Sequence, residues 1–407
     1  MKTWKIIILA IGDLVAAYAS LFLMLKISFG EKQGTAAEDH ILPFSVIFGI
    51  WIIVLFIFDQ YDPIAGRPKV YNMKRLGYAL TTAFFTGTIV FYVGQFGINP
   101  KLNLLLVFVF FVILYISWRR IVFKLLGGAF VERVYFLDSN EYVSILKSTI
   151  KGNPQLGYAL VETESESDIV ISKIPFSRGK KLLSLAGAYE SIMQKIPVDI
   201  AEKTLGYQIE SRQENILGVF LKRSFDIVFS LTALAATSWL WPIIIAGIKL
   251  DDRGPVLYTH KRVGLDNKPF SFIKFRSMKV DAEKDGAVWA EKEDSRVTKF
   301  GRFLRKSHLD EIPQMINVLR GDMSVVGPRP ERPEFVSQLE EEIPLYDLRH
   351  IIKPGFTGWA QIKYRYARTV SESKEKFEYD LYYIKNKSFI LDMGVMLKTV
   401  QIVVTHL

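Results

Sequence analysis

The chain has 407 residues; 50% are hydrophobic, 23% are charged, and cysteine is absent. This composition excludes a disordered or collagen-like chain, disulfide frameworks, cysteine-ligated zinc and thiol catalysis, and the length predicts two or three domains. The formal net charge of +10 favours lipid headgroups, phosphates or nucleotides as partners, whereas nucleic acid is not expected because the basic residues flank apolar segments.

Four apolar stretches occupy the N-terminal part, at residues 4–28, 41–58, 76–98 and 102–123. Each is close to the ~20 residues that a helix needs to cross a ~30 Å hydrocarbon core. The first stretch is too long for a signal peptide, and no small-residue cleavage site precedes the acidic segment 31–40. The sequence therefore predicts a four-helix transmembrane bundle as the first domain, residues 1–128.

The cations of the short connections predict the orientation of this bundle. They gather before the first stretch, between the second and the third, and after the fourth: Lys2, Lys5, Arg67, Lys69, Lys74, Arg75, Arg119, Arg120 and Lys124. By the positive-inside rule, the N-terminus, the middle connection and everything after Arg120 face the cytoplasm. Asp13 lies in the first stretch near its cytoplasmic end, where a structural or interfacial role is favoured over a functional one.

Residues 129–210 have the composition of a small α/β module. The short apolar runs RVYFLD, GYALV, DIVIS and IPVDI predict strands, and the segments 140–150 and 180–195 predict helices. A dinucleotide-binding fold needs G-x-G-x-x-G after its first strand, but residues 135–142 read YFLDSNEY. A structural, dimerising or regulatory module without a cofactor is therefore favoured over nucleotide binding.

The third predicted domain, residues 211–407, begins with a fifth apolar stretch at 224–248. Basic residues precede and follow it, so both ends carry cytoplasmic signals. Pro242 lies inside the stretch, where it breaks or kinks a helix, and the hydroxyls of Thr237 and Ser238 are candidates to bind the freed carbonyls. We expect a re-entrant membrane helix over 222–249; a fifth spanning helix with a tolerated proline is the alternative. The final segment, 388–407, is expected to lie at the interface or pack on the domain.

The rest of this domain contains a pair of carboxylates, Asp310 and Glu311, in the segment HLDEIPQ. Neighbouring residues on a helix point about 100° apart, so one carboxylate can face a substrate while the other tunes a metal ion or a proton. Cations suited to binding phosphate oxygens occur in the surrounding segments: Lys274, Arg276, Arg302, Arg305, Arg320 and Arg329.

A structural interpretation of the same residues stays open. Ser307 and Asp310 fit an S-x-x-D capping box that opens a helix running to Leu319 and stopping at Gly321. Pro328 and Pro330 hold Arg329 in extended backbone, which either presents its guanidinium rigidly to a phosphate or simply stiffens a loop. No D-x-D or P-loop motif occurs, and the histidines at 260, 308 and 350 are too scattered for a zinc signature.

At these residues the sequence resembles the bacterial polyprenol-phosphate phosphoglycosyl transferases, in the long membrane-anchored form that initiates exopolysaccharide or O-antigen chains. The resemblance covers residues 220–407 through ordered blocks: KRSFD, GPVLYTHKRVGLDNKPFSFIKFRSM, SHLDEIPQMINVLRGDMSVVGPRPERPEF, KPGFTGWAQ and YDLYYIKN. The N-terminal helices and small module match that form by architecture. Family members often have Ser-Pro at the membrane break, where this chain has Trp241 and Pro242.

The resemblance implies a multi-pass protein of the bacterial inner membrane with a cytoplasmic catalytic domain. Such enzymes transfer a hexose 1-phosphate from a UDP-sugar to undecaprenyl phosphate with Mg²⁺ and release UMP, through a phosphosugar on the aspartate that matches Asp310. Glu311 is expected to bind Mg²⁺ together with Asp310 or to assist proton handling. Arg305, Arg329, Lys274 and Arg276 are expected to bind phosphate.

The sugar is left open: UDP-glucose or UDP-galactose is expected from the long form, and the segment KYRYA at 363–367 lies where members vary with the donor. A homodimer through the small module is a further expectation. Two alternatives stay open. One is a lipid-acceptor glycosyltransferase that releases UDP, and the other is a non-catalytic scaffold of polysaccharide assembly.

Overall fold

The computed structural model describes residues 3–58, 60–61, 70–94, 100–125, 131–153, 157–173, 181–201, 205–210, 216–282, 294–364 and 369–406. They fall into two compact units, Met1–Ala188 and Tyr189–Leu407. Lys2, Arg67 and Lys69, which contributed to the predicted orientation, and residues 365–367 of the KYRYA segment lie outside the described residues.

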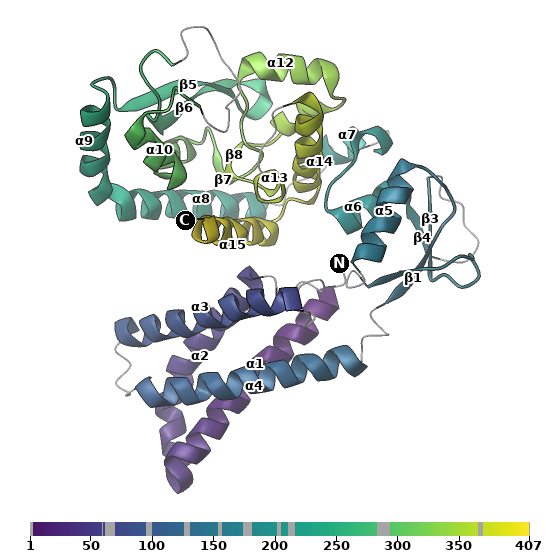
Figure 1. Cartoon of the computed structure of the whole chain (residues 1–407), viewed down its shortest axis with the longest axis vertical. Coiled ribbons are helices and arrows are strands. Elements are labelled where there is room, and N and C mark those ends of the chain that lie inside the picture. Colours follow the sequence, from purple (N-terminus) through teal and green to yellow (C-terminus); the bar gives the residue numbers. More distant parts are fainter. Residues whose placement is uncertain are drawn as a thin grey trace. The chain divides into compact units, whose positions relative to one another are not determined.

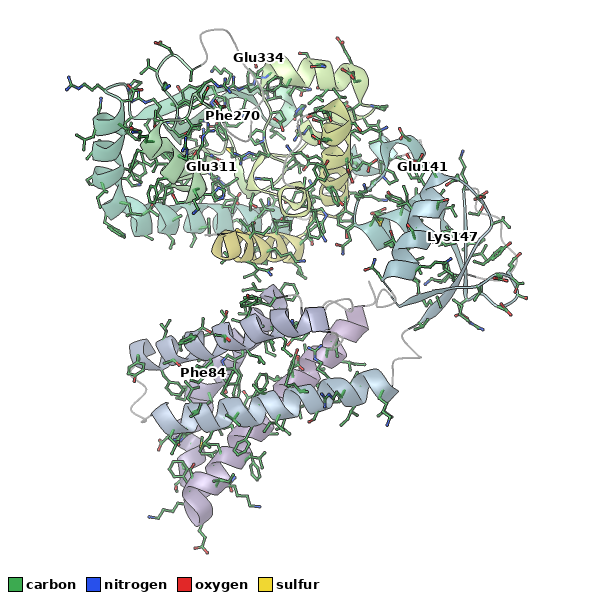
Figure 2. The ribbon with its side chains drawn as sticks, in the orientation of Figure 1. Phe84, Glu141, Lys147, Phe270, Glu311 and Glu334 are labelled. Atoms are coloured by element: carbon green, nitrogen blue, oxygen red, sulfur yellow. The ribbon has the colours of Figure 1, made fainter. Side chains whose placement is uncertain are left out.

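Four long helices open the N-terminal unit: α1 (Thr3–Phe29), α2 (Gln33–Ile57), α3 (Val70–Gly94) and α4 (Pro100–Leu125). A 3-10 turn, Gly30–Lys32, joins the first two. Both α1 and α3 pack against α2 and α4 (Figure 1). Aromatic rings of α2, α3 and α4 contact one another between the helices. Phe84 of α3, labelled in Figure 2, lies with its ring centroid 5.0 Å from that of Phe108 on α4. Large apolar side chains thus form a core as well as the outer surface.

Three stretches of the described chain are long and apolar enough to span a membrane: Ile7–Ile57, Leu102–Val122 and Ile216–Asp251. The apolar part of α3, Leu76–Tyr92, is shorter. Such stretches are typical of membrane proteins, because a water-soluble fold rarely keeps so many apolar side chains exposed. The chain is therefore a membrane protein.

Asp13 of α1 forms a buried ion pair with Arg119 of α4. Arg119 Nη2 lies 2.6 Å from Asp13 Oδ2 and Nε lies 3.2 Å from Oδ1. The same guanidinium donates to the carbonyl of Gln60 at 2.9 Å, and its Cζ lies 5.0 Å from the ring centroid of Tyr115. Because every part of this charge pair has a partner inside the bundle, the contacts support the predicted structural role of Asp13.

The small module contains a parallel sheet in the order β2-β1-β3-β4. Its elements are β1 (Glu132–Phe136), α5 (Glu141–Gly152), β2 (Tyr158–Leu160), β3 (Ile169–Ser172), β4 (Lys181–Ser184) and α6 (Leu185–Met193). The runs RVYFLD, GYALV and DIVIS contain strands as predicted. The run IPVDI does not: Val198–Ile200 is a 3-10 turn, and the fourth strand is β4, inside the segment predicted as helix.

The segment after α6 packs with the C-terminal unit. Ile196 and Val198, with Leu205 and Ile209 of α7 (Leu205–Glu210), share an apolar core with residues of α12 and α14. The Ile196 N–H also donates to the Glu378 carbonyl at 2.9 Å. The apolar side chains of 196–209 therefore complete the core of the C-terminal unit.

The predicted break at Pro242 separates two helices. α8 (Ile216–Thr237) ends in a 3-10 turn, Ser238–Leu240, and α9 (Trp241–Asp251) starts with Pro242 in its first turn, where a missing N–H is tolerated. The Thr237 hydroxyl donates to the Ala233 carbonyl at 2.7 Å and the Ser238 hydroxyl donates to the Ala235 carbonyl at 2.8 Å. In Figure 1 the two helices run in clearly different directions.

The remaining elements enclose the candidate site. Strand β5 (Leu257–Val263) pairs antiparallel with β6 (Pro269–Phe275), and β7 (Ser324–Val326) pairs parallel with β8 (Gly355–Thr357). Around them lie α10 (Lys299–Lys306), the 3-10 helix η6 (Leu309–Glu311), α11 (Gln314–Arg320), α12 (Pro333–Glu342), the 3-10 helix η7 (Tyr346–His350), α13 (Trp359–Lys363), α14 (Val370–Asn386) and α15 (Phe389–His406).

The last helix packs on this unit, as predicted for residues 388–407. Val395 is fully buried. Asp392 accepts hydrogen bonds from Lys222 Nζ and from the Tyr383 hydroxyl, both at 2.6 Å. Asp392, which interrupts the apolar pattern of α15, therefore joins this helix to α8 and α14.

Candidate active site

The two carboxylates lie on a short turn between helices. α10 ends at Ser307, whose hydroxyl donates back to the Phe303 carbonyl at 2.9 Å, and His308 takes a left-handed conformation with φ of 55°. Asp310 and Glu311 then lie in η6, and α11 starts after Pro313. The capping-box prediction is wrong, because Ser307 closes the preceding helix instead of opening the next one. The predicted stop at Gly321 is confirmed, with φ of 90°.

Asn317 holds this turn beside strand β6. Its Oδ1 accepts the N–H of Ile273 at 3.1 Å and its Nδ2 donates to the carbonyl of Ser271 at 2.7 Å. The side chain is fully buried, so both bonds are shielded from water. These contacts join α11 to β6, and η6 packs against the same strand. The carboxylates and Lys274, which are distant in sequence, are thereby brought together.

Asp310 is buried, with 6% of its surface exposed. Burial, followed by the charge of Glu311, raises the pKa of the Asp310 carboxyl to about 7, against the lowering influence of Lys274, Arg305 and Arg329. Among the described residues, no side chain or N–H forms a hydrogen bond or ion pair with this carboxylate. Three of the predicted cations therefore act on Asp310 through space.

Glu311 is paired with Arg329. The Arg329 Nη2 and Nη1 atoms lie 2.5 Å and 3.3 Å from the two Glu311 carboxylate oxygens. Burial alone would raise the pKa of Glu311, but Arg329, His308 and Lys274 together outweigh it and the pKa is lowered. Glu311 is therefore ionised at neutral pH, and its charge is part of what disfavours the ionised form of Asp310. Figure 2 marks Glu311 within the C-terminal unit.

Lys274 and Arg305 complete the cationic surroundings. Burial and the charge of Arg305 lower the pKa of Lys274 to about 8, and its Nζ lies 5.2 Å from the ring centroid of Tyr258. Arg305 Nε donates to the Ser277 hydroxyl at 2.9 Å. Burial disfavours the charged form of Lys274 most, and an anionic ligand beside it would favour that form again.

The other predicted cations lie elsewhere. Arg276 is buried, donates to the carbonyl of Asp252 and lies 3.7 Å from that residue's carboxylate. Arg302 and Arg320 are exposed. The structure thus brings together Asp310, Glu311, Lys274, Arg305 and Arg329, and it gives Arg276 a partner in the segment after α9.

Sequence reasoning missed a second layer of charges. Arg262 Nε donates to His260 Nε2 at 2.8 Å, and its Nη1 lies 3.4 Å from a Glu331 carboxylate oxygen. Lys376 Nζ donates to the other Glu331 oxygen at 2.8 Å. The period-2 alternation of Tyr258, His260 and Arg262 on the strand that pairs with Lys274 was a usable signal, because such residues share one face.

The carboxylate pair fits Mg²⁺ only as a partial site. The described residues contain no group of three or more His, Asp or Glu side chains that would hold a metal ion by themselves. Mg²⁺ is, however, commonly held by one or two carboxylates together with waters and substrate phosphates. Asp310 and Glu311 are neighbours on η6 and are therefore the residues that would hold such an ion.

Comparison with known proteins identifies the family of the C-terminal part of the chain. The family described as bacterial sugar transferase matches residues 217–406. The chain is 41% identical over 239 residues to the UDP-N-acetylgalactosamine-undecaprenyl-phosphate N-acetylgalactosaminephosphotransferase of Aeromonas hydrophila, which covers 54% of this chain and 56% of the relative. It is 44% identical over 182 residues to the UDP-glucose:undecaprenyl-phosphate glucose-1-phosphate transferase of Escherichia coli (strain K12). This match covers 44% of this chain and 39% of the relative.

A third relative is matched over nearly its whole length. The exopolysaccharide production protein PSS of Rhizobium leguminosarum bv. phaseoli is 38% identical over 190 residues, which is 45% of this chain and 95% of the relative. The chain spans about half or less of the Aeromonas and Escherichia proteins. The family match, residues 217–406, contains Asp310 and its surrounding cations. The chain therefore belongs to the bacterial sugar transferase family.

Proposed function

We propose that the C-terminal unit transfers a sugar 1-phosphate from a UDP-sugar to undecaprenyl phosphate, with Asp310 as the nucleophile. The observation that supports this role most directly is a buried carboxylate among Lys274, Arg305 and Arg329, in a site with surplus positive charge. The names of the Aeromonas and Escherichia relatives state such transfers for N-acetylgalactosamine and glucose. The reaction would be the first membrane step of a polysaccharide.

The proposed reaction has two displacements at one phosphorus atom. An Asp310 oxygen attacks the sugar-linked phosphorus of the donor; the bond to the bridging oxygen breaks, and UMP leaves with the electron pair. A phosphate oxygen of the lipid then attacks the same phosphorus and displaces the Asp310 carboxylate, which yields the lipid-diphosphosugar. One site can therefore serve a water-soluble donor and a membrane-bound acceptor in turn.

The cations supply what a carboxylate needs to react with an anion. Lys274, Arg305 and Arg329 offset the repulsion between the ionised Asp310 and the donor phosphates, and they stabilise the charge that develops as the bond to UMP breaks. Glu311 fixes the Arg329 guanidinium through two contacts. Asp310 and Glu311 would hold Mg²⁺, which when bound supplies Lewis-acid neutralisation of phosphate charge. Removal of Mg²⁺ with EDTA should therefore abolish turnover.

The membrane placement of this site is part of the proposal. Apolar side chains of α8, of the 3-10 turn after it and of α9 are exposed, among them Leu231, Trp239 and Ile243. In the proposal, these side chains are buried in the inner leaflet of the bacterial inner membrane. The two helices enter and leave that leaflet from the cytoplasm, and the chain turns at the break beside Pro242. Single cysteines replacing the exposed Ile216 and Val280 test this topology. Labelling of both from the cytoplasmic side is expected, and labelling from opposite sides would contradict it.

The nucleotide product separates this reaction from a lipid-acceptor glycosyltransferase. The purified protein is reconstituted into membranes with undecaprenyl phosphate and Mg²⁺. Separate samples are incubated with UDP-glucose, UDP-galactose and the N-acetylamino form of each. We expect UMP from at least one donor and none from Asp310→Asn. Release of UDP would favour the glycosyltransferase, and no nucleotide release from any donor would favour a scaffold.

A further inference from the structure

The loop that carries Arg329 is held through its carbonyl groups. Pro328 and Pro330 have no N–H, so hydrogen bonds to their backbone involve only their oxygens. The Pro328 carbonyl accepts the N–H of Gly355, the Arg329 carbonyl accepts Arg349 Nη2, and the Pro330 carbonyl accepts Arg262 Nη1, each at 2.8 Å. Three successive carbonyls are thus fixed, two of them by guanidinium groups.

Arg349 of η7 is itself firmly anchored. It is buried, its Nη2 lies 3.2 Å from the Asp380 carboxylate on α14, and its Nη1 donates to the Tyr346 hydroxyl. Its Cζ also lies 4.9 Å from the centroid of the Tyr346 ring. Asp380 is buried as well, so the ion pair is shielded from water and has little freedom to rearrange. The donor to the Arg329 carbonyl is therefore a fixed point of the fold.

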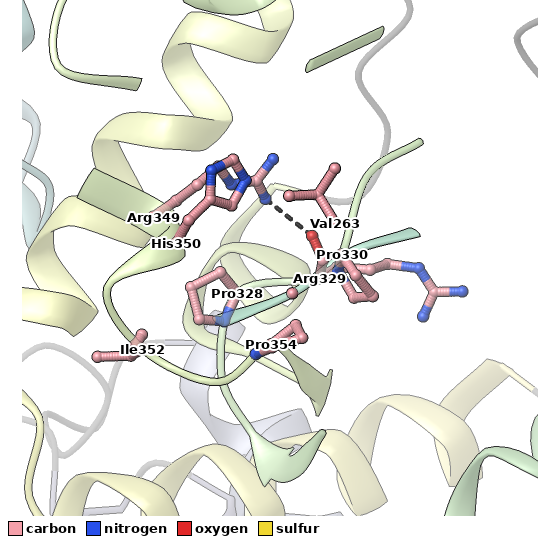
Figure 3. A pocket seen from close by; sticks show the side chains of 9 residues that line it. Val263, Pro328, Arg329, Pro330, Arg349, His350, Ile352 and Pro354 are labelled. Carbon is pink, nitrogen blue, oxygen red and sulfur yellow. Dashed lines mark hydrogen bonds between the residues drawn. The ribbon is translucent and has the colours of Figure 1, made fainter. Parts of the chain in front are cut away.

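The geometry connects this anchor to the carboxylates. Figure 3 shows the Arg329 carbonyl directed toward Arg349 while the Arg329 side chain extends away from it. That side chain forms the two contacts with Glu311 described above. When the peptide groups on both sides of a residue are fixed, the direction of its Cα–Cβ bond is fixed too. The contact with Arg349 therefore sets the direction in which Arg329 reaches the site.

We propose that Arg349 is a positioning residue for catalysis: by holding the Arg329 carbonyl it directs the Arg329 guanidinium toward Glu311 and the substrate phosphates. Arg349 acts through Arg329 and touches no reacting atom. The proposal rests on the proposed transferase activity and extends it to a residue outside the carboxylate and phosphate-binding groups. Asp380 shares the role, because it holds Arg349.

A double-mutant cycle tests whether Arg349 acts through Arg329. UMP release is measured for the wild type, Arg349→Lys, Arg329→Ala and the double variant, with the full-length protein in membranes. A lysine keeps the charge near Asp380 but lacks the guanidinium fork. We expect Arg349→Lys to lower kcat/KM about tenfold in the wild type and less than about twofold when Arg329 is already alanine. We also expect the loss to divide between kcat and KM as it does for Arg329→Ala.

Arg223 provides a matched control. Its guanidinium also donates to two backbone carbonyls, those of Val318 and Leu319, at 2.7 Å and 2.8 Å, at the end of α11. Arg223→Lys should lower the unfolding temperature to a similar extent as Arg349→Lys. Its effect on kcat/KM should be the same with and without Arg329, since it does not contact the Arg329 loop.

The outcomes separate this inference from the activity on which it rests. If the wild type is active and Arg349→Lys lowers kcat/KM equally with and without Arg329, the positioning role is wrong and the proposed function is unaffected. Failure of the wild type to release UMP from any donor would overturn the proposed function and the inference with it. If Arg349→Lys does not fold, the same cycle is measured with Asp380→Asn. We then expect a smaller loss of kcat/KM, which again disappears when Arg329 is already alanine.

Discussion

The two units of this protein each bury an aspartate, and the surroundings of the two differ. Asp13 in the helix bundle receives two hydrogen bonds from Arg119, whose third nitrogen, Nη1, donates to the Gln60 carbonyl. Asp310 in the C-terminal unit is surrounded by Lys274, Arg305 and Arg329 without pairing to any of them, and its pKa is raised to about 7. The first arrangement is closed and the second is open to a ligand.

This is the difference that we expect between a structural charge and a reactive one. A buried ion pair in which every guanidinium nitrogen has a partner holds two helices together. Beside Asp310, the cations Lys274, Arg305 and Arg329 outnumber the ionised Glu311, so an arriving phosphate would be attracted by these cations. Burial alone therefore does not indicate function; the state of the neighbouring charges does.

Substitution of the two aspartates should have opposite consequences for activity. Asp310→Asn removes the nucleophile, so UMP release should fall at least about 10³-fold. Asp13→Asn should leave kcat/KM within about threefold, because the C-terminal unit has its own apolar cores. Steady-state UMP release by membranes, normalised to folded protein, measures both. A comparable loss of kcat/KM in the two variants would mean that the distinction between the sites is not valid.

Breaking the closed pair should cost stability instead. Arg119→Met leaves Asp13 buried without its partner, which typically costs about 3–5 kcal/mol. Replacing both charges, with Asp13→Leu and Arg119→Met together, should recover most of the loss, since matched apolar groups need no desolvated charge. Thermal unfolding in detergent compares the three proteins. A double variant as unstable as Arg119→Met would show that the pair contributes through packing.

Neutralising Asp310 should stabilise the protein, and only at higher pH. In the unfolded chain an aspartate ionises near pH 4, whereas the folded Asp310 holds its proton up to about pH 7. The wild type therefore loses stability as the pH rises from about 4 to 7, and Asp310→Asn does not. Without Mg²⁺ and donor, we expect the variant to unfold about 5 °C higher above pH 7 and at the wild-type temperature near pH 4. An increase that is the same at every pH would contradict this account.

The smallest expected effect concerns Lys274. Its pKa of about 8 means that it loses its charge as the pH rises through 8. The affinity for UDP, measured by calorimetry without turnover, should therefore fall about threefold between pH 7 and 9. Lys274→Arg should remove this pH dependence, because a guanidinium stays charged throughout the range. An unchanged pH dependence in this variant would assign the titration to another group.

The sequence predicted the parts of the fold that local patterns determine. The four apolar stretches correspond to α1–α4, and the break at Pro242 follows from the chemistry of proline. The run IPVDI was misassigned as a strand, because its apolar residues serve the core of the C-terminal unit, a long-range contact that periodicity does not reveal. The capping-box interpretation of Ser307 is wrong because this residue ends α10 and the chain turns at His308, with φ of 55°, before the next helix.

In the candidate site, too, the sequence predicted the residues that lie in distinctive local segments and not those that depend on long-range packing. Asp310, Glu311 and Arg329 lie in two nearby segments with distinctive chemistry. The placement of Arg276 beside Asp252 depends on where the segment after α9 returns to the end of β6. The roles of Arg349 and Asp380 depend on packing between η7, α14 and the proline-flanked loop. No local pattern indicates these contacts, because their residues lie 20 and 31 positions apart in the chain.

The most direct test of the central claim is the covalent state of Asp310. The purified protein is incubated with a UDP-sugar and Mg²⁺ in the absence of lipid, and its intact mass is measured before and after addition of undecaprenyl phosphate. We predict a gain equal to one sugar phosphate, mapped to the peptide containing Asp310, that disappears when the lipid is added and never forms in Asp310→Asn. A turning-over enzyme that shows no adduct, or an adduct that persists in Asp310→Asn, would contradict the account.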